Sequence, residues 1–470
     1  MATKLLKREL DLTTGSVFKK LIIFAVPIVL AYMLDKAFNM TDTIMLGILV
    51  NDKAVGAVGA TGTIDTLLLN LFMGIASGVS VVVSRCVGAK NVQRARRTVG
   101  TSLVACFFGG IFFGLIGFFG AETFLTWMQC DVSLIPQAAL YMKIYCLGMP
   151  VILLNNCIAG ILRAVGDSVR PMIYLTIGGV ANIILNYVFI KAFGMTVDGV
   201  ALATVLSRLI SLVLSFIAIK KSTGYSRFEF KYLKIFKSEL LEALSVGIPT
   251  GIQGSLFSIS NIMISSTVNS FGEAATIGVS IAGQLDGWMY LAGNAIAVAG
   301  MSFVSQNFGA RNHKRVSEAI IKACILVSIV QVTVGLFGYA ISEPFFRMMT
   351  RDPLVIQFAG IRLIWFAFTY FLCGIMEVLS LAMRAIGKSF SSMIISLICV
   401  CAFRIFWLYT FYLLNPTFGM IYVSYPVSWI LCAVIDAPIV ISVIRKAIKK
   451  ESQEKASDGN IEVTSTDAVQ

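Results

Sequence analysis

The chain has 470 residues, of which 57% are hydrophobic and only 13% are charged, and its mean hydropathy is +0.85. Soluble domains carry about 25% charged residues, so this composition excludes a water-soluble globular domain and indicates an integral membrane protein. The formal net charge is +13. The basic residues lie in short loops between apolar stretches, which favours membrane orientation over nucleic-acid binding.

Twelve apolar stretches follow one another along the chain, each close to the length of about 20 residues that a membrane-spanning helix needs. Backbone groups in lipid must be hydrogen-bonded within their own segment, so helices are expected here. We therefore predict an all-α membrane protein with twelve transmembrane helices. The predicted spans are residues 21–46, 54–82, 98–120, 134–158, 171–193, 200–219, 241–268, 276–302, 319–341, 356–378, 391–413 and 422–444.

Basic residues are distributed unevenly between the two ends of these spans. The N-terminus, the loops that follow even-numbered spans and the C-terminus hold 28 Lys and Arg residues. The opposite loops hold four, namely Lys53, Lys191, Arg347 and Arg351. Basic loops face the cytoplasm, so both termini are predicted to be cytoplasmic.

Two motifs in the first half of the chain recur in the second half. Gly88-Ala-Lys-Asn-Val-Gln-Arg-Ala95 matches Gly309-Ala-Arg-Asn-His-Lys-Arg-Val316, and Arg163-Ala-Val-Gly-Asp-Ser168 matches Arg384-Ala-Ile-Gly-Lys-Ser389, both at an offset of 221 residues. Six spans per repeat give both copies the same topology. We therefore predict two pseudo-symmetric six-helix bundles related by a parallel repeat, an arrangement that usually encloses a substrate site between its halves.

The repeat divides the chain into five segments. They are a cytoplasmic N-terminus (1–20), an N-terminal bundle (21–219), a basic connector (220–238), a C-terminal bundle (239–445) and a polar cytoplasmic tail (446–470) that is predicted to be disordered.

The first span carries polar side chains on one helical face. Tyr32, Asp35, Asn39 and Asp42 fall at i, i+3, i+7 and i+10. A carboxylate in hydrocarbon is energetically expensive, so it should face the bundle interior or water, and Asp42 becomes a candidate proton or cation switch. The alternative is a solvated carboxylate at the membrane edge or, for Asp35, one paired with the adjacent Lys36.

The fifth and sixth spans add neutral polar groups. Asn182 and Asn186 lie one turn apart, and Thr204 follows in the next span. One carboxylate with neutral oxygens suits a monovalent cation, or hydrogen bonds that hold the carboxylate. The same groups could equally join helices to one another. Arg208 follows Thr204 by one turn and could neutralise a carboxylate.

The second half lacks an equivalent acidic switch. The positions that match Asn182 and Asn186 are Phe403 and Trp407. Glu377 is expected to be solvated near the end of its span. A single histidine and the absence of a Walker-type loop from the sequence argue against a histidine-built metal centre and against ATP as the energy source, so no cofactor is expected.

Five motifs occur in order within residues 15–445, and together they resemble the multidrug and toxic compound extrusion (MATE) family. They are Asn39-Met-Thr-Asp-Thr-Ile-Met-Leu-Gly47, Ser84-Arg-Cys-Val-Gly-Ala-Lys-Asn91, Ile161-Leu-Arg-Ala-Val-Gly-Asp-Ser168, Asn182-Ile-Ile-Leu-Asn-Tyr-Val-Phe-Ile190 and Gly199-Val-Ala-Leu-Ala-Thr204.

The resemblance implies a bacterial secondary antiporter rather than an enzyme. It would export organic, cationic amphipathic compounds (multidrug efflux) in exchange for H⁺ or Na⁺, by rocker-switch alternating access as a monomer in the lipid of the inner membrane. The coupling carboxylate falls on Asp42 and its polar cluster on Asn182, Asn186 and Thr204. Some members have Asp where this chain has Asn186, and the single carboxylate here favours H⁺.

We expect the substrate cavity between the halves, with Tyr32, Asp35 and Asn39 in its lining. One alternative is a lipid-linked precursor flippase of related architecture, against which twelve spans and an acidic first span argue. The other is a channel or a non-transporting membrane protein, against which the duplication argues. A predominantly cationic cavity would contradict cationic cargo.

Overall fold

The computed structural model describes residues 9–128 and 130–466, with backbone alone at 52, 63–65, 72, 452 and 454–466. The regular elements in this part of the chain are all helices. The N-terminal half contains α2 (Val17–Leu49), α3 (Asp52–Gly88), α4 (Val92–Trp127), α5 (Ile135–Leu147), α6 (Met149–Ala164), α7 (Val169–Lys191) and α8 (Val197–Lys221).

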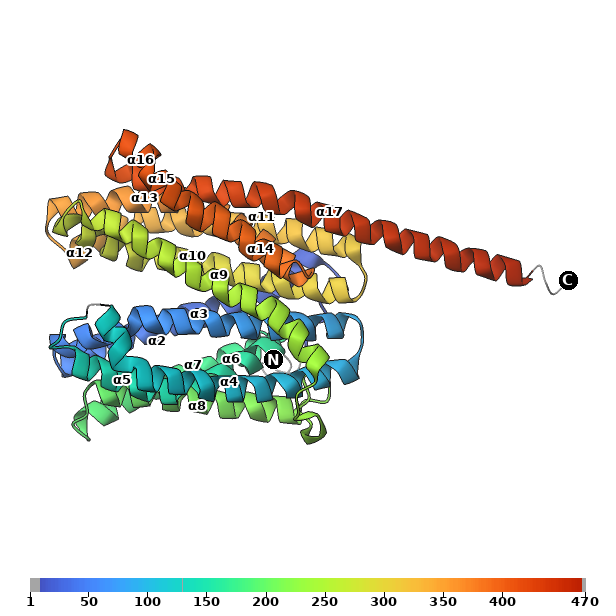
Figure 1. Ribbon diagram of the computed structural model, residues 1–470, viewed down its shortest axis with the longest axis horizontal. Coiled ribbons are helices and arrows are strands. Elements are labelled where there is room, and N and C mark those ends of the chain that lie inside the picture. Colours follow the sequence, from blue (N-terminus) through green and yellow to red (C-terminus); the bar gives the residue numbers. More distant parts are fainter. Residues whose placement is uncertain (1–8, 129, 467–470) are drawn as a thin grey trace.

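A short connector with one helical turn, η1 (Phe230–Tyr232), leads to the C-terminal half. That half contains α9 (Lys237–Asn269), α10 (Glu273–Gly309), α11 (His313–Ala340), α12 (Ser342–Met349), α13 (Pro353–Ala385), α14 (Ser389–Ser396), η2 (Leu397–Ala402), α15 (Phe403–Tyr409), α16 (Phe411–Leu414) and α17 (Phe418–Thr466). The two halves form two bundles that lie one above the other (Figure 1).

The twelve predicted spans correspond to helices of the structure. Ten helices among the described residues are long and apolar enough to cross a membrane, if the nearly continuous α14–α16 segment is taken as one. The bent pair α5–α6 forms an eleventh span, with an angle of 51° at Gly148. The remaining predicted span, 241–268, lies in α9, which is equally long but more polar because it contains residues such as Gln253 and Ser258. The predicted all-α class is confirmed.

The C-terminal tail differs from its prediction. The structure continues α17 without interruption from the membrane span to Thr466, where the sequence predicts disorder from residue 446. Its first part, residues 446–456, holds four Lys, two Glu and two Ala, which are good helix formers, and it prolongs a helix that already exists, so no new nucleus is needed. Figure 1 shows it projecting away from the bundles.

The duplication extends to the backbone conformation. Lys90 and Arg311, 221 positions apart, both adopt positive φ, at 54° and 57°, where α3 and α10 end. Gly166 and Gly387, also 221 positions apart, have φ of 89° and 88° after α6 and α13. Side chains strongly disfavour this region, whereas glycine tolerates it. The two halves therefore turn at equivalent positions with the same geometry.

The halves meet along a seam of glycines between α3 and α9. A Cβ added at Gly74 would lie 2.4 Å from the backbone nitrogen of Gly251, and one at Gly78 would lie 2.2 Å from the carbonyl oxygen of Ala243. Gly247 approaches the backbone of α3 in the same way, with an added Cβ 2.9 Å from the Cα of Ile75. Small residues of this kind let helix backbones approach closely within a membrane.

A second contact joins the halves where α3 and α10 end. Gly88 and Gly309 are repeat partners, and each lies against the backbone of the other helix. Arg85 donates from Nε to the carbonyl oxygen of Ala385 at 3.1 Å, and Gln306 donates from Nε2 to that of Ala164 at 2.7 Å. The two donors are 221 positions apart, and so are the two acceptors. We call this pseudo-symmetric pair of hydrogen bonds the latch.

Further bonds reinforce the same end of the molecule, which also carries the basic loops. Arg85 pairs with Glu242 of α9 at 3.0 Å. The segment before α2 packs beside the latch, and Leu12 in this segment is fully buried. The carbonyl oxygen of Leu12 accepts a hydrogen bond from Nδ2 of Asn307 at 3.1 Å. We call this the basic end; it is closed by contacts between the two halves.

The glycine seam predicts a position-dependent effect of adding one methyl group. Gly78→Ala should lower the melting temperature in detergent by several degrees, because the new Cβ would collide with the backbone of α9. Gly59→Ala on the same helix is the control, since no atom lies within 4 Å of its added Cβ. Thermal unfolding followed by circular dichroism measures both. Equal melting temperatures for the two variants would contradict the seam.

Candidate ion and substrate sites

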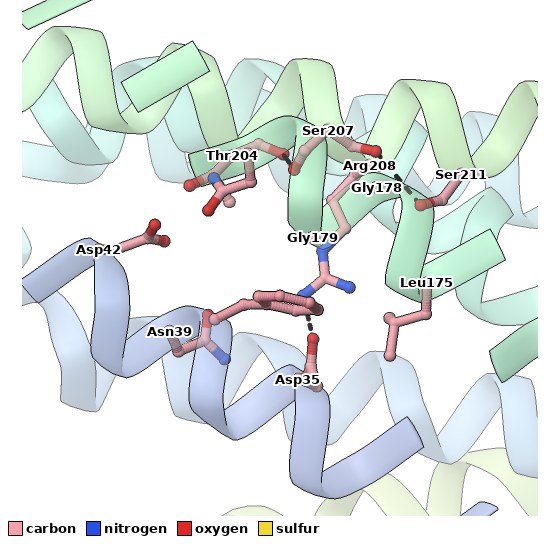
Figure 2. Close-up of a pocket in the computed structure, with 12 residues that line it drawn as sticks. Asp35, Asn39, Asp42, Leu175, Gly178, Gly179, Thr204, Ser207, Arg208 and Ser211 are labelled. Carbon is pink, nitrogen blue, oxygen red and sulfur yellow. Dashed lines mark hydrogen bonds and ion pairs between the residues drawn. The ribbon is translucent and has the colours of Figure 1, made fainter. Parts of the chain in front are cut away.

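Helices α2, α7 and α8 enclose a small polar pocket in the N-terminal half (Figure 2), which we call the N-half pocket. Asp42 and Asn39 reach it from α2, Asn182 from α7 and Thr204 from α8. These helices pack against one another because small residues, such as Gly178 and Gly179 of α7, lie where they meet. Residues more than 130 positions apart in the sequence thus surround one space.

Asp42 is held by an amide from the neighbouring helix. Asn186 donates from Nδ2 to Oδ1 of Asp42 at 2.6 Å, and to Oδ1 of Asn182 at 3.4 Å. Asn186 is fully buried, and its own carbonyl oxygen has no hydrogen-bond partner among the described residues. Thr204 lines the same pocket and bonds back to the carbonyl oxygen of Val200 at 2.9 Å. The structure therefore brings together all four predicted coupling residues.

Asp35 has a different partner from Lys36. Arg208 of α8 donates from Nη2 to Oδ1 of Asp35 at 2.7 Å, as Figure 2 shows. The Lys36 ammonium instead lies over the ring of Trp288, 5.6 Å from its centroid, in the other half. The alternative that paired Asp35 with Lys36 is wrong, and the neutralising role considered for Arg208 is confirmed. Adjacent residues point to different sides of a helix, which explains the outcome.

The volume of the N-half pocket limits what it can hold. The pocket measures about 20 Å³, which is room for a water molecule or a small ion. Organic ligands occupy pockets of about 300–1,000 Å³. Asp35 and Asn39, predicted to line the substrate cavity, thus lie around a space that is too small for such cargo in this conformation. Tyr32 lies apart from this pocket and packs against the apolar core around α10 and α11.

A metal centre of the usual kind is not formed in the described part of the chain, which holds no cluster of three or more His, Cys, Asp or Glu side chains. At Asp42 one carboxylate is surrounded by neutral groups, and the nearest amide presents its NH₂ rather than its oxygen.

A much larger space lies in the C-terminal half, between α9, α10, α13, η2, α15 and α17. This C-half cavity measures about 490 Å³, within the range of small-molecule sites. Asn70 of α3 also lines it and donates to the carbonyl oxygen of Gly254 at 3.3 Å. Phe257 and Ser258, which are not acidic, form part of its wall. The cavity therefore borders the interface between the halves but belongs mainly to one of them.

Four charged side chains line the C-half cavity, two of them basic and two acidic. Arg362 donates from Nε to Oδ2 of Asp286 at 2.7 Å. Arg404 and Glu377 are the other two. Glu377 was expected to be solvated, but it faces this cavity, because α13 runs on for two further turns and places the span's end at Ala385. The lining is thus neither predominantly cationic nor predominantly acidic.

Aromatic rings form much of the remaining wall. Tyr370 stacks on Phe366 and on Trp429, with ring centroids 5.0 Å and 5.7 Å apart, and the centroids of Phe366 and Trp429 are 6.1 Å apart. Tyr422 and Tyr425 lie beside them. The sequence analysis missed this site, although the spacing of aromatic residues at i, i+4 in α13 and at i, i+3, i+7 in α17 places each set on one helix face.

The Asp35–Arg208 pair predicts non-additive effects of mutation. Asp35→Asn and Arg208→Gln should each destabilise the protein, because each leaves a partly buried charge unpaired. The double variant should lose less free energy of unfolding than the two single variants lose in total, with a coupling energy of about 1 kcal/mol in a double-mutant cycle. Chemical denaturation in detergent measures it. Strict additivity would show that the two side chains do not interact.

Comparison with known proteins assigns the family. The model of the MatE family matches residues 27–188 and 249–410, two stretches in the register of the repeat. A probable multidrug resistance protein of Bacillus subtilis, YpnP, is 28% identical over 395 residues, covering 84% of this chain and 88% of that protein. A probable multidrug resistance protein of Thermotoga maritima, NorM, is 27% identical over 393 residues, covering 82% and 84%.

The fold is also that of solved transporters. The structure of a multidrug resistance MATE family transporter in an outward-facing conformation superposes with a TM-score of 0.86 at 20% identity, covering 93% of this chain and 98% of that chain. The fold, the duplicated family match and the many apolar helices agree with one another. Because the family model matches more than half of its residues, the chain belongs to the MatE family of multidrug efflux transporters.

Proposed function

We propose that the chain is a secondary antiporter that exports small amphipathic organic compounds in exchange for H⁺. Family membership and the multidrug resistance proteins among its relatives support export of small molecules. The observation that carries the proposal is the presence of two separate sites of unequal size. A pocket of about 20 Å³ around Asp42 suits an ion, and a cavity of about 490 Å³ suits cargo.

The proton is the coupling ion in this proposal, in preference to Na⁺. The carboxylate of Asp42 accepts a hydrogen bond from the amide of Asn186, and it shares the pocket with the guanidinium of Arg208. Protonation would remove the charge that these groups hold. The three helices around the pocket would then pack differently, and this difference between the two protonation states is what coupling requires.

Helix α2 connects Asp42 to the interface between the halves. Phe24 of α2 packs edge-to-face on Phe303 of α10, with ring centroids 6.2 Å apart. Pro27, further along α2, removes one backbone hydrogen bond and makes the helix easier to bend. A change of packing around Asp42 can therefore reach the contacts with α10 through a single helix.

We assign the basic end to the cytoplasm, which makes the described conformation outward-facing. The positive-inside rule supports this orientation. The inward-facing state then requires the halves to separate at the latch of Arg85 and Gln306. Substrate would be taken up from the cytoplasm after this separation and released outside when the latch forms again. A lipid-linked precursor flippase is less well supported, because the C-half cavity is not predominantly cationic.

Transport by purified protein in liposomes tests the proposal. Uptake of a fluorescent organic cation and, separately, of a fluorescent organic anion is followed under an imposed H⁺ gradient and then under a Na⁺ gradient. We expect the H⁺ gradient to drive one or both dyes in wild type. Asp42→Asn should reduce the gradient-driven rate to that of empty liposomes, because the amide cannot exchange a proton. Glu343→Gln, which removes an exposed ion pair, is the control.

Two results would contradict this proposal. Gradient-driven transport by Asp42→Asn at the wild-type rate would remove Asp42 from the coupling site. Transport driven by Na⁺ alone would refute the choice of the proton.

A further inference from the structure

We propose that the C-half cavity binds a planar aromatic organic anion, with the Arg404 guanidinium holding its negative group and the aromatic wall stacking on its ring. This assignment names the cargo class and rests on the proposed export function. The cation expected from the family resemblance is the competing class. Binding can be measured without a gradient, so it is tested independently of coupling.

Arg404 carries a positive charge that no carboxylate offsets. It is only 4% exposed, and none of the ion pairs in the described part of the chain includes it. Its Nε donates to Oγ of Ser428 at 3.0 Å, and its guanidinium lies over the ring of Tyr425, 4.0 Å from the centroid. A guanidinium offers five N–H donors, so most of its capacity is left for a ligand.

The other charged groups of the cavity already have charged neighbours. Arg362 is paired with Asp286, and Glu377 has Arg384 as its neighbour of opposite sign. Within this cavity, the negative group of a ligand would therefore be stabilised most strongly next to Arg404. A buried charge without a partner is costly, and aromatic faces compensate only part of that cost. A carboxylate or sulfonate of a ligand would supply the missing partner in bidentate geometry.

The backbone that precedes Arg404 in the chain is unusual as well. The span opens into the π-helical segment η2 from Leu397 to Ala402, and α15 begins at the residue before Arg404. Such widened turns are frequently found at functional sites. The equivalent position in the first half is Ile183, which lies within the regular helix α7. The guanidinium and the widened turn are thus a property of this half alone.

The aromatic wall determines the shape of the ligand. Trp429 and Tyr370 are inclined by 25° and Tyr370 and Phe366 by 21°, so Tyr370 stacks on both neighbours, whereas Phe366 and Trp429 are inclined to each other by 44°. A flat ring placed against such a stack gains dispersion and burial that an aliphatic anion or inorganic phosphate would not. The chemistry of the site thus points to a ligand that combines a planar ring with a negative group.

Two dyes that share a planar xanthene ring but differ in charge test the proposal. Fluorescein is an anion at mildly alkaline pH, and tetramethylrhodamine methyl ester is a cation. Binding of each to purified protein in detergent is measured by fluorescence anisotropy. We expect wild type to bind fluorescein, and Arg404→Gln to bind it about tenfold more weakly or worse, because a charged hydrogen bond is lost. Binding of the cation should not weaken.

Control variants separate this effect from general ones. Arg347→Gln removes an exposed arginine outside the cavity and should bind fluorescein like wild type. The binding assay applies no ion gradient, so a failure of gradient-driven transport would not by itself change this result. Fluorescein binding unchanged in Arg404→Gln, binding of the cation alone, or binding of neither dye by wild type would each overturn the proposal.

Wild-type protein supplies a second measurement should Arg404→Gln fail to fold. Naphthoate should displace bound fluorescein. Acetate, which has the charge without the ring, and naphthylmethylammonium, which has the ring with the opposite charge, should displace it at least about tenfold less effectively. Displacement by the ammonium compound as effective as displacement by naphthoate would refute the anion site.

Discussion

The structure depends on one backbone crossing at its basic end. Gly88 of α3 and Gly309 of α10 are repeat partners, and each would collide with the other helix if it carried a side chain. Because these helices touch there without intervening side chains, the latch residues Arg85 and Gln306 can reach carbonyl groups of the opposite half. The same crossing is a place where two similar bundles can separate, since its bonds are few and lie at one end.

Duplication supplied two similar scaffolds, and their chemistry has diverged. The first half keeps a carboxylate in a pocket that only a small species can enter. The second half has a large aromatic cavity with guanidinium groups. If the ion binds in the first half and the cargo in the second, as proposed, the two need not compete directly. Under the proposed function, coupling must then pass through the helices that touch both halves, of which α2 is one.

The sequence was sufficient to predict the helices and the repeat, because each depends on local spacing or on residues that recur at a fixed offset. The grouping of Asn182, Asn186 and Thr204 with Asp42 came from the family resemblance. The sequence did not predict the partner of Asp35 between Lys36 and Arg208, since that depends on how α2 and α8 are rotated against each other. The C-half cavity was missed for a related reason. Arg404 lies within the predicted span 391–413, and only the packing of α13, η2 and α17 places aromatic rings around it.

Under the proposed function, the protonation of Asp42 sets the state of the basic end. The distance across that end tests it directly, with spin labels at Gln93→Cys and Lys314→Cys, which are exposed and related by the repeat. Cys130 and Cys324, the cysteines that are not fully buried among the described residues, are first replaced by serine. Double electron–electron resonance spectroscopy should show a population with longer distances between the two labels. The size of this population should change with pH in wild type and be independent of pH in Asp42→Asn. The same pH dependence in both proteins would contradict the account.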